Sequence, residues 1–266
     1  MAPPTPALWA IERGDGAPAG WLFGTIHSLP AGIEWRTPAL ERALDDARML
    51  VVEIRDLDPQ RVAEITRRTA RDEAVAPILE RVDPGARPRL KAALSRAGQR
   101  LRDADQLETW AVAISLARTG TEPAATTSVD SALIADFASC PVLGLERTEE
   151  QLAIFDQLSE RTQRRMLLAV MKEQETQSAI ADATLRAWLA GDLARLDGMS
   201  RRGMLSDPVI ADALNAERNR AWVAMIEPLL RQGKAPLIAV GTLHMIGPEG
   251  LPALLATKGY RVRRIQ

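Results

Sequence analysis

The two ends of the chain repeat one pattern, and this repeat constrains the fold more than any other feature. An apolar run leads into G-T-I-H at residues 24–27, and a second apolar run leads into G-T-L-H at residues 241–244. The histidines that close these tetrads, His27 and His244, are the only two of the 266-residue chain. Each tetrad follows a strand-like run and precedes a predicted helix and a further strand. We therefore interpret the two ends as related β-loop-α-β units, with coincidence as the alternative.

Turn and cap residues divide each unit into its elements. Apolar residues 8–13 and 21–26 flank a G-D-G-A-P-A-G turn and predict a hairpin. Thr37-Pro38 is a typical helix start, and the run M-L-V-V-E-I at 49–54 predicts a buried strand. The C-terminal unit predicts a strand at 236–240, a helix from Pro248 to about Lys258, and a strand at 260–265.

Between the units the sequence is mainly helical. We predict a single domain, residues 1–266, with a helical insertion over approximately residues 59–232 that is interrupted by a strand near 141–145. The predicted fold class is α/β, with a mixed sheet built from the two related halves.

Composition excludes several functions. The net charge is −1 and the charges are interspersed, which argues against a nucleic-acid partner. No apolar run is long enough to span a membrane, so no membrane insertion is expected. Cys140 is the only cysteine, which excludes an internal disulfide. The oligomeric state is not predictable from these data.

Four polar side chains follow predicted strands at their carboxyl ends. These are His27, Glu53, Glu146 and His244. Loops at this edge of an α/β sheet gather groups from several strands, so we expect the four to meet. Two imidazoles and a carboxylate suit Mn, Co or Zn. We therefore predict a metal on His27, His244 and Glu53 or Glu146, activating a water, with the remaining carboxylate as general base.

Structural explanations compete with these assignments. A histidine after a strand is often structural. Glu146 and Asp130 lie where acidic residues favour a helix N-terminus. Arg218 and Asn219, in E-R-N-R-A-W, would ordinarily lie on a solvated helix face.

Several longer stretches carry a family resemblance. They are W-L-F-G-T-I-H-S-L-P, L-V-V-E-I, V-D-S-A-L, V-L-G-L-E-R-T-E-E-Q, E-R-N-R-A-W and V-G-T-L-H-M-I-G-P-E-G-L-P-A-L-L. In these the chain resembles the TraB/GumN family, which is related to the Tiki metalloproteases and more remotely to erythromycin esterases and ChaN-like haem-binding proteins. The resemblance implies an α/β fold of two halves with a helical insertion. It also implies a site that uses both histidines and Glu53, with four further residues nearby: Asp130, Glu146, Arg218 and Asn219.

Three functions follow from the residues and the resemblance. The first is a metal-dependent hydrolase, a peptidase, in which Arg218 holds a substrate carboxylate or an oxyanion. The second is a metal-free hydrolase of a small ester, with a histidine as general base. The third is a haem-, metal- or peptide-binding protein without turnover. The resemblance also implies a periplasmic or secreted location, although the sequence shows neither an export signal nor the cysteine pair of many exported relatives; the cytoplasm is the alternative.

Overall fold

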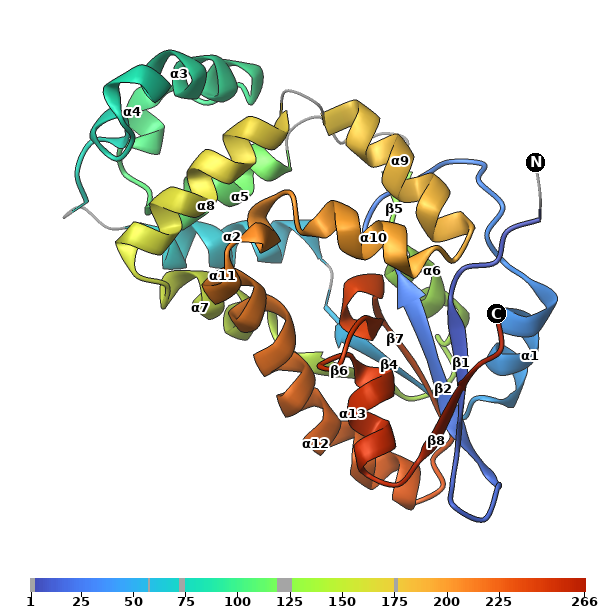
Figure 1. Ribbon diagram of the computed structural model, residues 1–266. Coiled ribbons are helices and arrows are strands. Elements are labelled where there is room, and N and C mark those ends of the chain that lie inside the picture. The colour runs from blue at the N-terminus through green and yellow to red at the C-terminus, as the bar shows by residue number, and fades with distance from the viewer. Residues whose placement is uncertain (1–2, 57, 72–74, 119–125, 175–176) are drawn as a thin grey trace.

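The structure is a computed structural model that describes residues 3–56, 58–71, 75–118, 126–174 and 177–266. Within these residues it contains a six-stranded mixed sheet in the order β6-β4-β7-β2-β1-β8 and a two-stranded sheet of β3 and β5. Helices cover both faces of the larger sheet and form a separate layer beyond its β6 edge (Figure 1). The predicted α/β class is confirmed.

The elements have the following bounds. The strands are β1 Leu8–Glu12, β2 Pro18–Thr25, β3 Leu29–Pro30, β4 Met49–Ile54, β5 Thr126–Thr127, β6 Val142–Glu146, β7 Pro236–Gly241 and β8 Arg261–Arg264. The α-helices are α1 Pro38–Asp46, α2 Pro59–Thr69, α3 Arg87–Arg96, α4 Leu101–Ala104, α5 Thr109–Ala117, α6 Val129–Asp136, α7 Thr148–Asp156, α8 Glu160–Glu173, α9 Gln177–Leu189, α10 Leu193–Ser200, α11 Pro208–Ala211, α12 Glu217–Arg231 and α13 Leu251–Thr257. A π-helical turn, η5 Asp212–Ala216, joins α11 to α12, and short 3-10 turns include η1 Ile78–Glu80, η2 Pro84–Ala86, η4 Met204–Ser206 and η6 Thr242–Met245.

The two chain ends meet at the centre of the large sheet. Strands β2 and β7 pair in parallel, in a register that runs from Trp21 opposite Leu237 to Thr25 opposite Gly241. Strand β4 pairs in parallel with β7 on one side and with β6 on the other. The carboxyl ends of β2, β7, β4 and β6 therefore lie along one edge, and both G-T-x-H tetrads start there.

The two halves are related around the central β2–β7 pair. The first half runs β2–α1–β4 and the second runs β7–α13–β8, and the second strand of each half joins the sheet on the opposite side of the pair. Helix α1 packs on one face through Leu40 and Ala43, while α13 packs on the other through Leu251 and Leu255. Because neighbouring strand residues point to opposite faces, the apolar strands supply both cores.

Local sequence explains where these helices begin. Helix α1 begins at Pro38, and the Thr37 hydroxyl accepts a hydrogen bond from the Leu40 N–H at 3.1 Å, as the sequence predicts. Helix α13 begins at Leu251, three residues later than predicted. The backbone folds back before it, since a Cβ on Gly250 would lie 2.8 Å from the Ile246 carbonyl oxygen.

The helical segments between the halves divide into two groups. Helices α3, α5 and α8 enclose a core of their own, with Trp110 and Met166 fully buried. Helix α9 instead reaches the sheet, where the Trp188 indole N–H donates to the Gly24 carbonyl at 2.8 Å. In the described part of the chain, no helix has the length and apolar character needed to cross a membrane.

Candidate functional site

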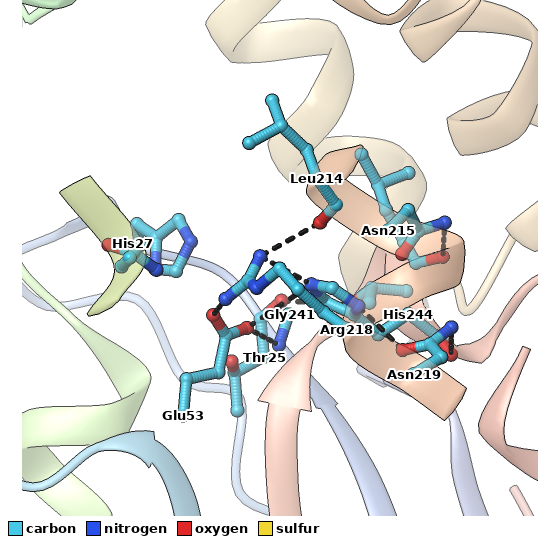
Figure 2. Close-up of polar contacts among 12 residues, drawn as sticks. Thr25, His27, Glu53, Leu214, Asn215, Arg218, Asn219, Gly241 and His244 are labelled. Carbon is cyan, nitrogen blue, oxygen red and sulfur yellow. Dashed lines mark hydrogen bonds and ion pairs between the residues drawn. The ribbon is translucent and has the colours of Figure 1, made fainter. Parts of the chain in front are cut away.

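The carboxyl edge of the sheet brings the predicted polar residues together. Glu53 lies within β4, Glu146 ends β6, His27 follows β2 and His244 lies in the turn after β7. A Cβ placed on Gly241 would lie 3.1 Å from Glu53 Oε1, 3.8 Å from His244 Cδ2 and 3.9 Å from His27 Nε2. Both imidazoles and the Glu53 carboxylate thus border one small space above this glycine. Figure 2 shows His27 and His244 on opposite sides of Glu53.

Arg218 lies at the centre of the buried part of the site. Its Nη2 donates to Glu53 Oε2 at 2.8 Å and also to Glu146 Oε1. Its Nε donates to Glu146 Oε2 at 3.1 Å, and its Nη1 donates to the Leu214 carbonyl at 2.9 Å and to His244 Nε2 at 3.2 Å. These contacts use all five guanidinium N–H groups. We call Arg218, Glu53, Glu146 and His244 the Arg218 cluster.

His244 is held in one tautomer. A guanidinium can only donate, so His244 Nε2 accepts from Arg218 and the ring proton is on Nδ1. Nδ1 then donates to Asn219 Oδ1 at 2.7 Å. Burial, together with the nearby charge of Arg218, lowers the pKa of His244 to about 3. The ring also packs against Trp222, at 4.5 Å between ring centres. His244 is therefore a fixed, neutral imidazole at neutral pH.

Glu53 is buried but ionised. Burial opposes its ionisation, yet the charges of His244, His27 and Arg218 and the Gly241 N–H, at 2.7 Å, lower its pKa to about 2. Since His244 is uncharged at neutral pH, Arg218 and the Gly241 N–H stabilise the carboxylate there. The net result is the opposite at Glu146. There the effect of burial outweighs the contact with Arg218, and the pKa is raised.

His27 lies outside the Arg218 cluster and beside Asp130. The His27 side chain is 77% exposed, and its Nδ1 lies 3.8 Å from Asp130 Oδ2. Asp130 Oδ1 accepts from the Thr25 hydroxyl at 3.0 Å, while the buried Oδ2 has no hydrogen-bond partner among the described residues. Burial raises the pKa of Asp130. The site thus joins one fixed, buried histidine to one exposed histidine with a carboxylate behind it.

The two tetrads contact each other directly. The Thr242 hydroxyl donates to the Thr25 carbonyl at 2.9 Å, as expected for a threonine that stiffens the loop. Gly24 lies against the same side chain, because a Cβ there would lie 2.8 Å from Thr242 Oγ1. Each tetrad therefore positions the other.

Arg218 and Asn219 lie inside the molecule, and not on the solvated helix face that their local sequence suggests. Asn219 is fully buried, and its Nδ2 donates to the carbonyls of His244 at 3.2 Å and Glu249 at 2.6 Å. Sequence reasoning missed Asn215 and Trp222, which line the same side of the helical segment. The spacing 215, 218, 219, 222 is a one-face helical pattern and was the available signal.

The residues present do not fit a metal in this arrangement. Among the residues that the structure describes, no three His, Cys, Asp or Glu side chains are grouped so that they could hold a metal ion. The physical reason is Arg218, whose guanidinium contacts Glu53, Glu146 and His244 at hydrogen-bond distance. The same contacts leave no N–H free for a substrate carboxylate or an oxyanion unless one of them breaks.

The fold and site define a class of α/β protein in which two glycine-threonine-histidine loops frame a buried arginine–carboxylate cluster. The chain belongs to the TraB/PrgY/gumN family, whose model matches residues 7–264. No curated protein and no solved structure matches the chain.

Proposed function

We propose that the chain is a hydrolase of a peptide or small ester, in which His27 is the general base and Asp130 positions it. The observation that carries the proposal is the contrast between the two histidines. His27 is exposed with a buried carboxylate 3.8 Å from its Nδ1, whereas His244 is buried with both nitrogens engaged. Of the two histidines, His27 is the one that can exchange protons with a substrate without breaking the contacts described above.

The reaction follows from this placement. His27 Nε2 takes a proton from water as the water oxygen bonds to the substrate carbonyl carbon. The imidazolium then gives this proton to the leaving nitrogen or oxygen as the bond between that atom and the carbonyl carbon breaks. Asp130 Oδ2 faces Nδ1 and stabilises the imidazolium between these steps. The Arg218 cluster holds the loop of His244 and the Glu53 carboxylate in place beside the reacting groups.

The metal-dependent peptidase predicted from the sequence remains the competing function. Its ligand types are present, and Glu53 Oε1 and His27 Nε2 border the space above Gly241. Export to the periplasm, which the family resemblance implies, also remains a prediction.

The deciding experiment measures hydrolysis of a peptide library and a panel of small esters in EDTA, and again after addition of Mn, Co or Zn. We expect turnover in EDTA, reduced about 10²–10⁴-fold in His27→Gln. Because His27 is exposed, this variant should retain the wild-type melting temperature. Asp130→Asn should lower kcat with little change in KM.

Each other outcome has a definite meaning. Turnover that appears only with added metal would support the metal-dependent peptidase and refute the proposal. Tight binding of haem, metal or peptide with no turnover on either panel would support the binding-protein function.

A further inference from the structure

We infer that the Arg218 guanidinium is the built-in cation of the site and supplies, among Glu53, Glu146 and His244, the positive charge that a divalent metal would otherwise supply. Its removal should convert these three side chains into a divalent-cation site. This inference concerns the charge arrangement of the buried cluster and does not depend on the hydrolase proposal.

The first argument is the geometry. One guanidinium contacts all three side chains, at 2.8 Å to Glu53 and 3.2 Å to His244, with two N–H groups on Glu146. All four side chains are about nine-tenths buried, with exposures of 8–11%. The three acceptors therefore already converge on a single positive charge that is shielded from water.

The second argument is the chemistry of the acceptors. Two carboxylates and one imidazole are ligands that zinc and manganese use. Asn219 holds the proton of His244 on Nδ1, which leaves the Nε2 lone pair directed into the cluster. Metal-binding histidines are commonly oriented by such a second partner on the other nitrogen. The three acceptors are therefore suitable ligands for a divalent metal, but in the wild type they accept hydrogen bonds from Arg218.

The third argument is that Arg218 cannot easily move aside. Its Nη1 is also bound by the Leu214 carbonyl, which belongs to the π-helical turn η5 just before α12. The guanidinium carbon lies 4.6 Å from the centre of the Trp222 ring. A divalent ion beside this fixed cation would experience strong repulsion in a buried site. Wild-type protein should therefore not bind a metal at these three side chains.

The test titrates metal-free wild type and Arg218→Ala with ZnCl₂ and with MnCl₂, using calorimetry and thermal unfolding. We expect that the wild type shows no zinc or manganese binding that depends on Glu53 and His244. Arg218→Ala should be destabilised, because it leaves two buried carboxylates without a counter-charge. Zinc should then bind at one equivalent per chain and raise the melting temperature by several degrees, and a second change, Glu53→Gln, should abolish both effects.

Arg81→Ala is the matched control. Arg81 is also buried, at 2% exposure, but its guanidinium donates to the backbone carbonyls of Ala76, Asp105 and Leu107 and to the Thr109 hydroxyl. Its loss should destabilise the protein without creating a zinc site, so zinc should not restore its melting temperature.

Three results would overturn the inference. One is stoichiometric metal binding by wild type that Glu53→Gln removes. Another is a folded Arg218→Ala variant that gains no zinc, and the third is equal rescue of Arg81→Ala. If Arg218→Ala is unfolded without metal, folding on zinc addition supports the inference; if it folds in neither condition, the wild-type titration decides. All readouts are binding or stability, so they are independent of whether a hydrolysed substrate is found.

Discussion

Two asparagines on one helical segment allow a quantitative test of how the site is held. Asn219 and Asn215 lie four residues apart, and both donate to the backbone of the second tetrad. The change to alanine removes a similar side chain at each position. The structure nevertheless predicts very different losses of stability, because the two amides differ in the number of hydrogen bonds they make.

The magnitude follows from those bonds. Asn219 is fully buried and makes three hydrogen bonds. Its Nδ2 donates to the carbonyls of His244 and Glu249, and its Oδ1 accepts from His244 Nδ1. Losing each of the two bonds to carbonyls costs about 1 kcal/mol, and losing the bond from the buried His244 Nδ1–H, which is then unpaired, costs about 1–3 kcal/mol. Asn219→Ala should therefore cost about 3–5 kcal/mol. Asn215 makes one, to Leu243 at 3.2 Å, and its buried Oδ1 has no partner among the described residues. Asn215→Ala should cost about 1 kcal/mol or less.

The measurement is equilibrium unfolding in urea, followed by tryptophan fluorescence, for the wild type and both variants. The comparison is valid when the urea dependence of the unfolding free energy is the same in all three. Equal losses in the two variants, or a loss below about 1 kcal/mol in Asn219→Ala, would refute the reasoning, because the three bonds would then not hold the loop.

Three further predictions concern the tetrads and the helices. In Gly24→Ala the new Cβ would lie 2.8 Å from Thr242 Oγ1 and 3.2 Å from Thr242 Cα, so the melting temperature should fall, at a cost of about 1–3 kcal/mol. In Gly198→Ala the new Cβ meets open space inside α10, so stability in urea should rise by about 0.5–1 kcal/mol, and a decrease would contradict this. The third prediction concerns pH. Burial lowers the pKa of His244 from 6.5 to about 3. Between these pH values His244 therefore binds a proton in the unfolded chain but not in the folded protein. Below pH 6.5 the unfolding free energy should therefore fall by up to about 1.4 kcal/mol per pH unit, and His244→Gln, compared by thermal unfolding between pH 7 and 5, should show a shallower decline.

The sequence alone determined the elements of the two halves. Strand β4 follows from its run of apolar residues, and α1 follows from the Thr37 cap and Pro38. The tetrads pointed to both histidines, and the carboxyl-edge argument predicted that Glu53 and Glu146 would meet them. In the structure Glu53 borders both histidines at Gly241, whereas Glu146 joins the cluster through Arg218. These signals are local, since burial periodicity, caps and turn residues act within a few positions of the chain.

Only the tertiary structure decided how the halves combine and which partners the polar groups take. The position of β7 between β2 and β4 brings residues more than two hundred positions apart into contact, and no local pattern specifies that order. The local composition around Arg218 and Asn219 does not indicate burial, because an arginine on a helix is ordinarily solvated. Only the one-face spacing and the family resemblance pointed to a place near the site. The burial of Arg218 is tolerated because all five of its N–H groups donate hydrogen bonds. The acceptors are two carboxylates, an imidazole and a backbone carbonyl. The difference between an exposed His27 and a fixed His244 arises for the same reason. The two tetrads differ in sequence only at their third residue, but they have different neighbours, and those neighbours come from distant parts of the chain.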